Sequence, residues 1–339
     1  MTHIQDLFFV AEISANHNGD IKRAYRLIEL AASAGATAVK LQTYTADSMT
    51  LDLPEFSVSS EHPLWSKKNL YELYKEAQTP WDWHKELFNY ARSLGLIPFS
   101  SPFDKSAVDF LETLDCPMYK IASLETGDLE LISYVAKTMK PVIISTGASE
   151  LSEIQEAVEA AINAGNENIS LLVCTSSYPA SASEAHVKRI KTLANSFNVQ
   201  IGISDHTLGV GVSIAAIAMG ATIIEKHLTI KRSEGGLDST FSMEPIEFEL
   251  LVSEGKKAYE SLGNEEWKIQ NSEKESRNLR RSLFIVKDVK VGDFATIENV
   301  RAIRPNGGTP PKYINNVIGK KFNDNYKAGT PVKIEYLQQ

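Results

Sequence analysis

The sequence predicts an α/β protein: a (β/α)8 TIM barrel followed by a small, mainly-β domain. Short runs of β-branched and aliphatic residues alternate with amphipathic segments throughout residues 8–263. The runs are nearly continuous in apolar residues, which is typical of parallel strands buried on both faces. Eight such units match a (β/α)8 barrel. A doubly wound open sheet is the alternative, but the glycine-rich loop that usually follows its first strand is replaced here by Asn-His-Asn-Gly at 16–19.

The barrel elements are expected in alternation along the chain. The strands are expected at 8–14, 38–44, 96–101, 118–123, 141–146, 169–176, 199–206 and 222–229, and the helices at 21–35, 80–94, 104–114, 128–139, 149–164, 183–197, 210–219 and 245–262. Local signals support several of these helices. Pro80 opens one helix and Gly95 follows it, and Gly165 follows another.

The residue pattern changes after the last expected helix. This change divides the chain into three parts. Residues 1–263 form the expected catalytic barrel, and the charged, polar stretch 264–280 is interpreted as a linker. Residues 281–339 contain short strand-like runs with Gly and Pro turns and little helical periodicity. Within them, residues 288–300 are weakly repeated in 325–337, which predicts two similar β half-units packed together.

Composition argues against several classes of function. The formal net charge of −8 argues against general nucleic-acid binding. The two cysteines, Cys116 and Cys174, lie in unrelated contexts, which matches neither a disulfide framework nor a zinc motif. The first residues lack the basic start and long apolar core of a signal peptide, and no apolar run is long enough to cross a bilayer. We therefore expect a cytoplasmic protein without a membrane partner.

Two histidines, His206 and His227, end consecutive expected strands. Because the carboxyl ends of parallel strands meet at one face of a barrel, the two imidazoles are expected side by side. A single histidine at a strand end is more often a structural hydrogen-bonding group, but two on consecutive strands favour a shared divalent metal ion. A third ligand would be glutamate, water or substrate, and such open coordination is typical of catalytic metal sites.

Two lysines, Lys40 and Lys120, lie inside apolar strand runs, where a buried amine has to be paired or functional. One interpretation is a Schiff-base lysine, as in aldolases, and the other is a clamp for the phosphate and carboxylate of an anionic substrate. Hydroxyl groups near other strand ends favour the clamp: Ser101, Ser123, Ser145 and Ser204. Glu12, at the end of the first strand, either pairs with a buried lysine or takes part in acid–base chemistry.

Taken in order, these residues resemble the sialic acid synthase family across nearly the whole chain. The motifs that carry the resemblance are AEISANHNG (11–19), VKLQT (39–43), SSPF (100–103), YKIAS (119–123), STG (145–147), CTSSYP (174–179), GISDHT (202–207) and EKH (225–227). Residues 281–339 look like the antifreeze-like (SAF, β-clip) domain of this family, with Arg304-Pro305 in the expected loop. The number and order of the motifs make the resemblance specific.

The resemblance implies a transferase that condenses phosphoenolpyruvate with an N-acetylated amino sugar and releases phosphate. It implies a divalent metal cofactor bound by His206 and His227, with Mn2+ in first place and Mg2+ or Co2+ as alternatives. Glu12, His206 and His227 are the implied catalytic residues. The phosphoenolpyruvate site is implied at Lys40, Ser101, Lys120, Ser123, Ser145 and Ser204, and the sugar site at Gln42, Tyr178, Asp238 and Arg304. Arg304 would reach the barrel of a partner subunit, which implies a domain-swapped homodimer.

Within this family, several segments are closer to pseudaminic acid synthases than to neuraminate synthases. They are 14–19, 41–45, 49–51, Trp65 with 70–74, and 79–84. The implied reaction joins phosphoenolpyruvate, 2,4-diacetamido-2,4,6-trideoxy-altrose and water to give pseudaminic acid and phosphate by C–O cleavage, a step of surface polysaccharide biosynthesis. Legionaminate or N-acetylneuraminate synthesis is the alternative, and a lysine-dependent aldolase or a non-enzymatic carbohydrate-binding protein is more distant.

Two further features concern particular side chains. Ser176 stands where neuraminate synthases usually carry Asn after Cys-Thr, and the loop at 235–238 also departs from familiar members. The aromatic side chains that follow the second expected strand are expected to pack in the core rather than to form a platform for stacking bases: Tyr71, Tyr74, Trp81 and Trp83.

Overall fold

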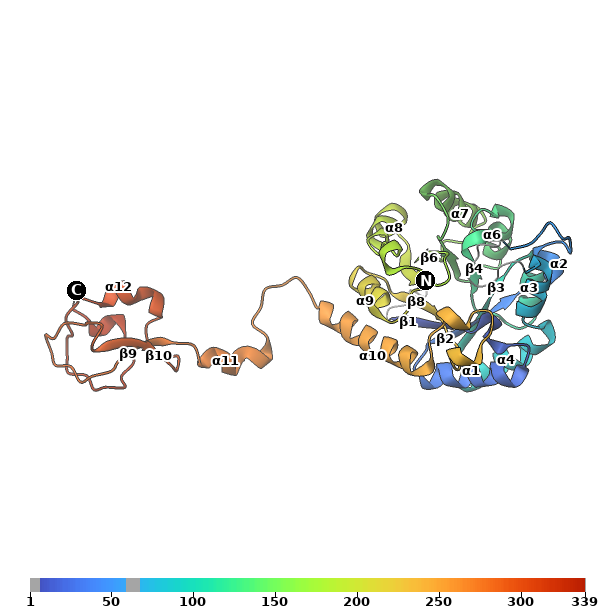
Figure 1. Cartoon of the computed structure of the whole chain (residues 1–339). Coiled ribbons are helices and arrows are strands. Elements are labelled where there is room, and N and C mark those ends of the chain that lie inside the picture. Colours follow the sequence, from blue (N-terminus) through green and yellow to red (C-terminus); the bar gives the residue numbers. More distant parts are fainter. Residues whose placement is uncertain (1–6, 59–67, 339) are drawn as a thin grey trace. The chain divides into compact units, whose positions relative to one another are not determined.

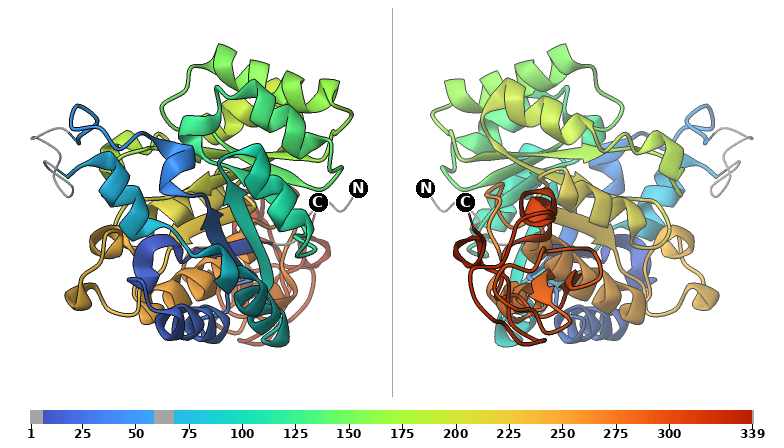
Figure 2. Two further views of the ribbon diagram at one scale, coloured as in Figure 1. Left: turned by 90° about the vertical axis from the view of Figure 1, so that its right-hand side faces the viewer. Right: turned by 90° about the vertical axis from the view of Figure 1, so that its left-hand side faces the viewer.

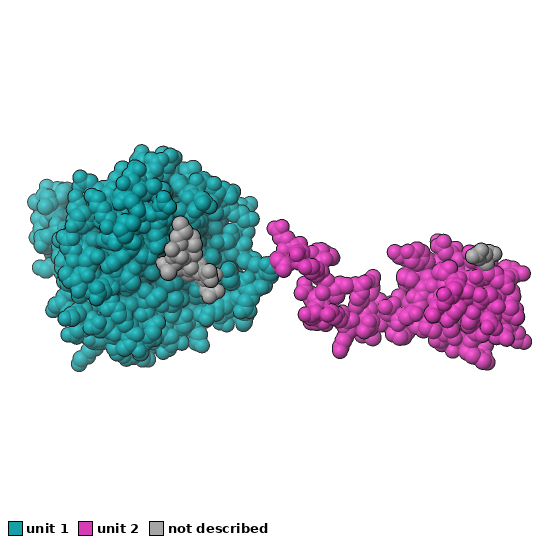
Figure 3. All heavy atoms as spheres, turned by 180° about the vertical axis from the view of Figure 1, so that it is seen from behind, with its two compact units in different colours: residues 1–263 teal, residues 264–339 magenta. Residues whose placement is uncertain are grey.

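Two compact units make up the chain, residues 1–263 and 264–339 (Figure 3). The structure, a computed structural model, describes residues 7–58 and 68–338. Trp65, one of the residues that carry the resemblance, lies outside the described residues. Each unit has a hydrophobic core of its own and is therefore described by itself.

The first unit is a barrel that eight parallel strands close within the described residues (Figure 1). The strands follow sequence order: β1 (Phe8–Glu12), β2 (Ala38–Thr43), β3 (Ile97–Pro102), β4 (Tyr119–Ile121), β5 (Val142–Ser145), β6 (Ile169–Cys174), β7 (Gln200–Ser204) and β8 (Ile223–His227). The register that joins β8 to β1 sets Phe8 beside Ile223 and Glu12 beside His227. The predicted (β/α)8 barrel is confirmed, and the open-sheet alternative is wrong.

Helices surround the strands (Figures 1 and 2). They are α1 (Ile21–Ser33), α4 (Trp81–Ser93), α5 (Lys105–Glu112), α6 (Leu129–Ala136), α7 (Leu151–Asn163), α8 (Arg189–Phe197), α9 (Gly211–Ala218) and α10 (Pro245–Leu262), with α2 (Ala46–Met49) and α3 (Leu70–Ala77) between β2 and α4. The helix expected at 183–197 is shorter, because His186 has a left-handed backbone with φ of 41°. That conformation interrupts a right-handed helix.

Helix caps determine where the connections at the mouth of the barrel end. The side chain of Asp20 accepts a hydrogen bond from the Lys22 backbone N–H at the start of α1, and Asp104 accepts one from the Ala107 N–H at the start of α5. Each carboxylate satisfies a backbone donor that has no partner within its helix. The caps therefore fix the lengths of the connections that leave β1 and β3.

The two histidine-bearing strands approach each other closely at Gly202 of β7. A Cβ atom at this position would collide with the carbonyl oxygen of Ile223 on β8 and with the side chain of Leu172 on β6. Only glycine fits at this point of the barrel wall, because it has no side chain. The close approach places the carboxyl ends of β7 and β8 next to each other.

The second unit has a small sheet and a core of its own. Strand β9 (Ser282–Ile285) pairs antiparallel with β10 (Val300–Ile303), and short helices α11 (Lys274–Asn278) and α12 (Ile314–Val317) belong to the same unit. The two halves of the predicted repeat meet in an antiparallel bridge between Val289 and Tyr326. No helix within the described ranges of either unit has the length and apolar character needed to span a membrane.

Candidate active site

Buried charged side chains gather inside the mouth of the barrel. The ammonium group of Lys40, on β2, lies 2.7 Å from Oε2 of Glu12 on β1 and 3.3 Å from Oε1 of Glu225 on β8. Lys40 also donates a long hydrogen bond of 3.5 Å to the hydroxyl of Ser101 on β3. Of the two expectations for Glu12, the structure shows the pairing with a buried lysine.

Glu225 is a central member of this cluster, and it was not among the predicted site residues. Its side chain accepts a hydrogen bond of 2.9 Å from the Ser204 hydroxyl, and its Oε2 has no hydrogen-bond partner among the described residues. Burial raises the pKa of Glu225, but Lys40 and Lys120 outweigh burial and bring it to about 2. Strand alternation could have found this residue, because Glu225 points to the same side of β8 as His227.

The two carboxylates around Lys40 differ in their proton affinity. Burial raises the pKa of Glu12, and the opposing effect of Lys40 does not cancel it. Burial lowers the pKa of Lys40, but Glu12 and Glu225 outweigh it and raise the pKa above its usual value. Lys40 is therefore a permanent cation at neutral pH. Since Glu225 is a strong acid here and Glu12 a weak one, Glu12 is the carboxyl suited to carrying a proton.

Lys120, on β4, forms a second ammonium site with a different environment. Its Nζ donates to the Ser145 hydroxyl at 2.5 Å and to the Ile121 carbonyl at 3.1 Å. Burial lowers the pKa of Lys120 to about 8. The nearby carboxylates of Glu225 and Glu12 oppose this shift, whereas the positive charge of Lys40 lowers the pKa further. The amine is charged at neutral pH and loses its charge in mildly alkaline solution.

Small hydroxyl side chains crowd around Gly147, just beyond β5. The Gly147 N–H donates to the Ser123 hydroxyl at 3.1 Å. A Cβ at Gly147 would collide with the hydroxyl of Ser176 and would lie 2.8 Å from that of Ser123. Ser176, the residue that departs from the neuraminate synthase pattern, therefore belongs to the same hydroxyl-rich wall as the predicted residue Ser123.

The imidazoles of His206 and His227 lie side by side, with ring centroids 5.3 Å apart. Nδ1 of His206 is 3.1 Å from the carbonyl oxygen of Thr175, so Nδ1 carries the proton and the lone pair is on Nε2. Nδ1 of His227 is 3.4 Å from the hydroxyl of Ser14, whose own proton goes to Asp238 at 2.7 Å. Because the Ser14 hydroxyl has given its proton to Asp238, it can only accept a hydrogen bond from His227. His227 therefore also carries its proton on Nδ1 and has its lone pair on Nε2. Metal-binding histidines are oriented in this way by an acceptor on the second nitrogen.

The protonation of these rings depends on their surroundings. Burial lowers the pKa of His227 far below its usual value, and the nearby His206 and Lys40 add to this effect. Burial also lowers the pKa of His206, but Cys174, whose sulfur lies 3.9 Å from Nδ1, outweighs it and raises the pKa. Within the described residues, no group of three or more His, Cys, Asp or Glu side chains is arranged to hold a metal ion. The two imidazoles are thus the protein donors that the geometry offers to a cation.

A cavity of about 390 Å³ opens beside this cluster. Five predicted site residues line it: Gln42, Ser123, Tyr178, His227 and Asp238. Glu125, which the prediction omitted, also lines it, and burial raises the pKa of Glu125. The other lining residues are mostly apolar: Ala15, Tyr44, Met49, Val58, Leu70, Leu73, Tyr74, Ala77, Phe103, Ala122, Leu124, Leu237 and Phe241. Tyr74 packs edge-on against Tyr44 and also lines the site, a role that the prediction did not include.

Aromatic rings close the histidine side of this cavity. The ring of Tyr178 lies 4.5 Å from that of His206, and the ring of Phe241 lies 5.0 Å from that of His227. Burial raises the pKa of Tyr178, so its hydroxyl is neutral and keeps a proton to donate. The site thus combines a charged floor with an aromatic wall.

A pair of buried charges lies directly beside the histidines in sequence. Lys226 is 3.0 Å from Asp205, and both side chains are 1% exposed. Asp205 also accepts hydrogen bonds from Thr207 and Ser213, and Lys226 donates to the carbonyl groups of Thr207 and Gly209. Because alternate residues face opposite sides of a strand, this pair lies behind the histidines and ties the ends of β7 and β8 together.

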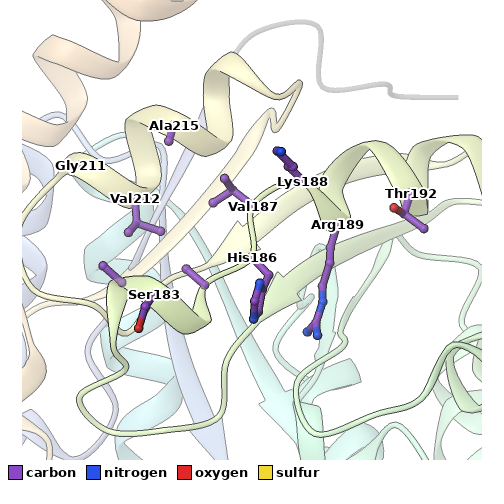
Figure 4. A pocket seen from close by; sticks show the side chains of 11 residues that line it. Ser183, His186, Val187, Lys188, Arg189, Thr192, Gly211, Val212 and Ala215 are labelled. Carbon is purple, nitrogen blue, oxygen red and sulfur yellow. The ribbon is translucent and has the colours of Figure 1, made fainter.

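A larger hollow, of about 620 Å³, lies on the outer side of the barrel between the start of α8 and α9 (Figure 4). His186, Lys188 and Arg189 are among the residues that line it. No predicted site residue is in its lining, and its charged side chains are exposed. The active site is therefore assigned to the smaller cavity at the barrel mouth. Arg304, the remaining predicted site residue, lies in the second unit just after β10, so its role across a dimer stays a prediction.

Comparison with known proteins agrees with this architecture. A family model described as "NeuB family" matches residues 27–267, and one described as "SAF domain" matches residues 280–337. A pseudaminic acid synthase from Helicobacter pylori is 42% identical, over 97% of this chain and 97% of that protein. An N,N'-diacetyllegionaminic acid synthase from Legionella pneumophila is 35% identical, over 98% of this chain and 94% of that protein. The crystal structure of an N-acetylneuraminic acid (sialic acid) synthetase from Leptospira borgpetersenii, in complex with citrate, is similar with a TM-score of 0.72 and 32% identity, over 80% of this chain and 90% of that chain.

These matches bear on both parts of the chain. The NeuB model spans most of the barrel unit, which carries the buried lysines and the paired histidines. The SAF match confirms the antifreeze-like domain expected at the carboxyl end. The resemblance that the motifs carried is confirmed: this chain is an enzyme of the NeuB family of sialic acid synthases, with a carboxyl-terminal SAF domain.

Proposed function

We propose that this chain is a pseudaminic acid synthase, which condenses phosphoenolpyruvate with 2,4-diacetamido-2,4,6-trideoxy-altrose. The observation that carries the proposal is the pair of buried ammonium groups, Lys40 and Lys120, at the mouth of a barrel beside two imidazoles and a largely apolar cavity. The similarity to pseudaminic acid synthases over nearly the full chain supports the choice of sugar.

A sugar series tests the proposal directly. Phosphate release from phosphoenolpyruvate is measured with the diacetamido-trideoxy-altrose substrate, with its legionaminate-forming counterpart and with N-acetylmannosamine. We expect the highest kcat/KM with the altrose derivative. A higher value with either other sugar would move the assignment to legionaminate or neuraminate synthesis, and the 35% identical legionaminate relative makes the former the principal alternative.

The residues of the cluster divide the proposed chemistry among them. Lys40 and Lys120 pair with the carboxylate and phosphate of phosphoenolpyruvate, and serine hydroxyls donate to the remaining oxygens: Ser101, Ser123 and Ser145. Ser204, the fourth serine proposed for this site, donates to Glu225 in the structure and contacts the substrate only if it gives up that hydrogen bond. Both lysines are nearly buried, at 4% and 2% exposure, and charge interactions are stronger there than in water. Gln42, Tyr178 and Asp238 hold the sugar in the adjoining cavity.

The proposed reaction forms one carbon–carbon bond, converts the sugar aldehyde to a hydroxyl group, and at carbon 2 replaces the C–O bond to phosphate by a C–O bond to water. Carbon 3 of phosphoenolpyruvate adds to the aldehyde of the open-chain sugar, and water adds to carbon 2. The resulting hemiketal phosphate then loses phosphate. Glu12, whose pKa is raised, takes the proton of the attacking water or of a sugar hydroxyl. With water labelled with oxygen-18, the label should enter the sugar product, and label in the phosphate would rule out C–O cleavage.

We infer that His206 and His227 bind a divalent cation, Mn2+ in first place, with Mg2+ or Co2+ as alternatives. Support comes from two adjacent imidazoles that share one tautomer, with Nε2 of each ring free to bind a cation. When bound, the cation supplies Lewis-acid polarisation of the sugar aldehyde. Loss of turnover after chelation and its recovery with Mn2+ would support the inference, and full activity in chelator would end it.

A lysine-dependent aldolase is the second candidate, and one observation favours it. The pKa of Lys120 is lowered to about 8, and depressed pKa values are typical of lysines that form Schiff bases. Borohydride with pyruvate would then trap a covalent adduct on Lys120. We expect no adduct, because the lysine donates to Ser145 within a hydroxyl-rich wall suited to an anion.

The remaining proposals concern assembly and location. We propose a domain-swapped homodimer in which Arg304 serves the partner's barrel. Mixing an Arg304→Ala variant with a His206→Ala variant tests this, because exchange of subunits would restore one complete site. The reducing, cytoplasmic setting expected from the sequence also stays a proposal.

A further inference from the structure

Tyr44 continues the inward-facing side of β2 beyond Lys40 and Gln42, because alternate residues of a strand point to the same side. It follows the strand directly and lines the cavity together with Gln42. Its ring lies edge-on to Tyr74 of α3, at 5.8 Å, and to Phe103 beyond β3, at 5.2 Å. These two contacts fix the direction in which the Tyr44 hydroxyl points.

The hydroxyl of Tyr44 makes no hydrogen bond to any residue the structure describes. The residue is only 3% exposed. Burial raises the pKa of Tyr44, and Asp238, Tyr74 and Glu12 raise it further, so the hydroxyl keeps its proton at neutral pH. The hydroxyl is not among the fully buried side-chain atoms that lack a partner, so it is open to the cavity and free to bind a ligand or water there. The cavity that Tyr44 lines is where such a partner would sit.

An apolar wall borders Tyr44 on the side of α2 and α3. Met49, Leu70 and Leu73 line this part of the cavity, and none of them has a hydrogen-bonding group in its side chain apart from the weakly accepting sulfur of Met49. A sugar hydroxyl placed against the wall would lose its water without gaining a hydrogen bond, whereas a methyl group is favoured there. The wall therefore suits a sugar in which some hydroxyl groups are replaced by acetamido groups or by hydrogen.

We propose that Tyr44, with Met49 and Leu73 beside it, is a specificity subsite for the acetamido and deoxy substituents of the sugar. The Tyr44 hydroxyl donates its proton to an acetamide carbonyl oxygen, while the two aliphatic side chains cover the methyl groups of the acetyl and 6-deoxy positions. The inference rests on the proposed function, because it requires an acetamido-deoxy sugar in this cavity. The polar lining residues Gln42 and Asp238 remain for the hydroxyl groups.

Two substitutions test the two parts of the subsite by steady-state kinetics. In Tyr44→Phe, kcat/KM for the diacetamido-trideoxy sugar should fall about tenfold or more, mainly through the KM for the sugar. The KM for phosphoenolpyruvate should stay within about twofold, since this substrate binds at the lysines. In Met49→Gln, an amide of similar length enters the wall. The preference for the diacetamido sugar over N-acetylmannosamine should then fall about tenfold.

Tyr25→Phe is the matched control, because it removes a hydroxyl that donates to Glu86 on the outer helices. It should change neither KM. An unchanged sugar KM in Tyr44→Phe, or an equal rise of the KM values for both substrates, would overturn the subsite. If the unaltered enzyme releases no phosphate with the diacetamido sugar, the proposed function itself fails and the subsite with it. The behaviour of the wild-type enzyme therefore separates the two failures.

Discussion

Replacing Glu225 by Gln removes one carboxylate of the buried cluster at the barrel mouth. An unperturbed Glu carboxyl has a pKa of 4.5, whereas the pKa of Glu225 in the fold is about 2. At 1.36 kcal/mol for each pKa unit, the difference corresponds to about 3 kcal/mol of stabilisation of the charged form. Glu225 is 3% exposed, so solvent screens it little. Removing one partner of a buried ion pair costs about 3–5 kcal/mol in other proteins, which agrees.

The assay is urea unfolding of the wild type and of Glu225→Gln, followed by circular dichroism. Because the folded pKa of Glu225 is depressed, its contribution is fully present above pH 4.5 and is lost as the pH falls from 4.5 towards 2. The variant should therefore be less stable by about 3 kcal/mol at pH 7. The difference between the two proteins should shrink below pH 4.5.

Glu130→Gln is the matched control, because Glu130 pairs with Lys105 at 2.8 Å on the surface, where it is 84% exposed. Exposed pairs contribute little to stability, so this variant should unfold with the wild type. The same unfolding midpoint for Glu225→Gln and Glu130→Gln would refute the reasoning. The buried ion pair in the barrel would then contribute no more to the free energy of unfolding than a solvent-exposed pair.

Three further predictions follow from the same site. Because Lys120 has a pKa of about 8 and must be charged to bind an anion, kcat/KM for phosphoenolpyruvate should fall up to about tenfold per pH unit above pH 8. Lys120→Arg should remove this break, and its persistence in the variant would assign it to another group. His206→Ala should weaken Mn2+ binding, measured by titration calorimetry, by more than about 100-fold with an unchanged circular dichroism spectrum; native affinity would contradict the metal assignment. Asp205→Ala leaves the buried Lys226 charge unpaired and should lower the unfolding free energy by about 3–5 kcal/mol. Unchanged thermal unfolding would show that this pair does not hold the ends of β7 and β8.

Most of the barrel could be predicted from the sequence because its signals are local. Apolar runs such as 141–146 and 169–176 were expected as strands, and β5 and β6 lie within them. The prediction of the barrel elements omitted the short helices α2 and α3, and it made one helix too long. The helix expected at 183–197 begins at Arg189, because His186 adopts a left-handed conformation that no local pattern signals.

The candidate site was predicted in part, and its gaps have a common cause. Strand-end residues such as His206 and His227 could be assigned to one place because all parallel strands end at the same face. Glu225 lies in the EKH motif and Glu125 lies two residues after the YKIAS motif, but their contribution depends on which charges lie across the barrel. Tyr74 was expected in the core, because the sequence does not tell which side of α3 faces the cavity.

The sequence alone determined the barrel, the small carboxyl-terminal domain and the identity of most charged groups at the mouth. The reason is that the apolar pattern of each strand and the order of the strands are local properties of the chain. Only the tertiary structure decided how these groups share their charges. Glu12 and Glu225 meet at Lys40 although they are more than 200 residues apart in the chain. The depressed pKa of Glu225 and the raised pKa of Glu12 arise from burial and from distances of a few ångströms between strands. Such distances exist only once the barrel has closed, because closure brings β8 beside β1.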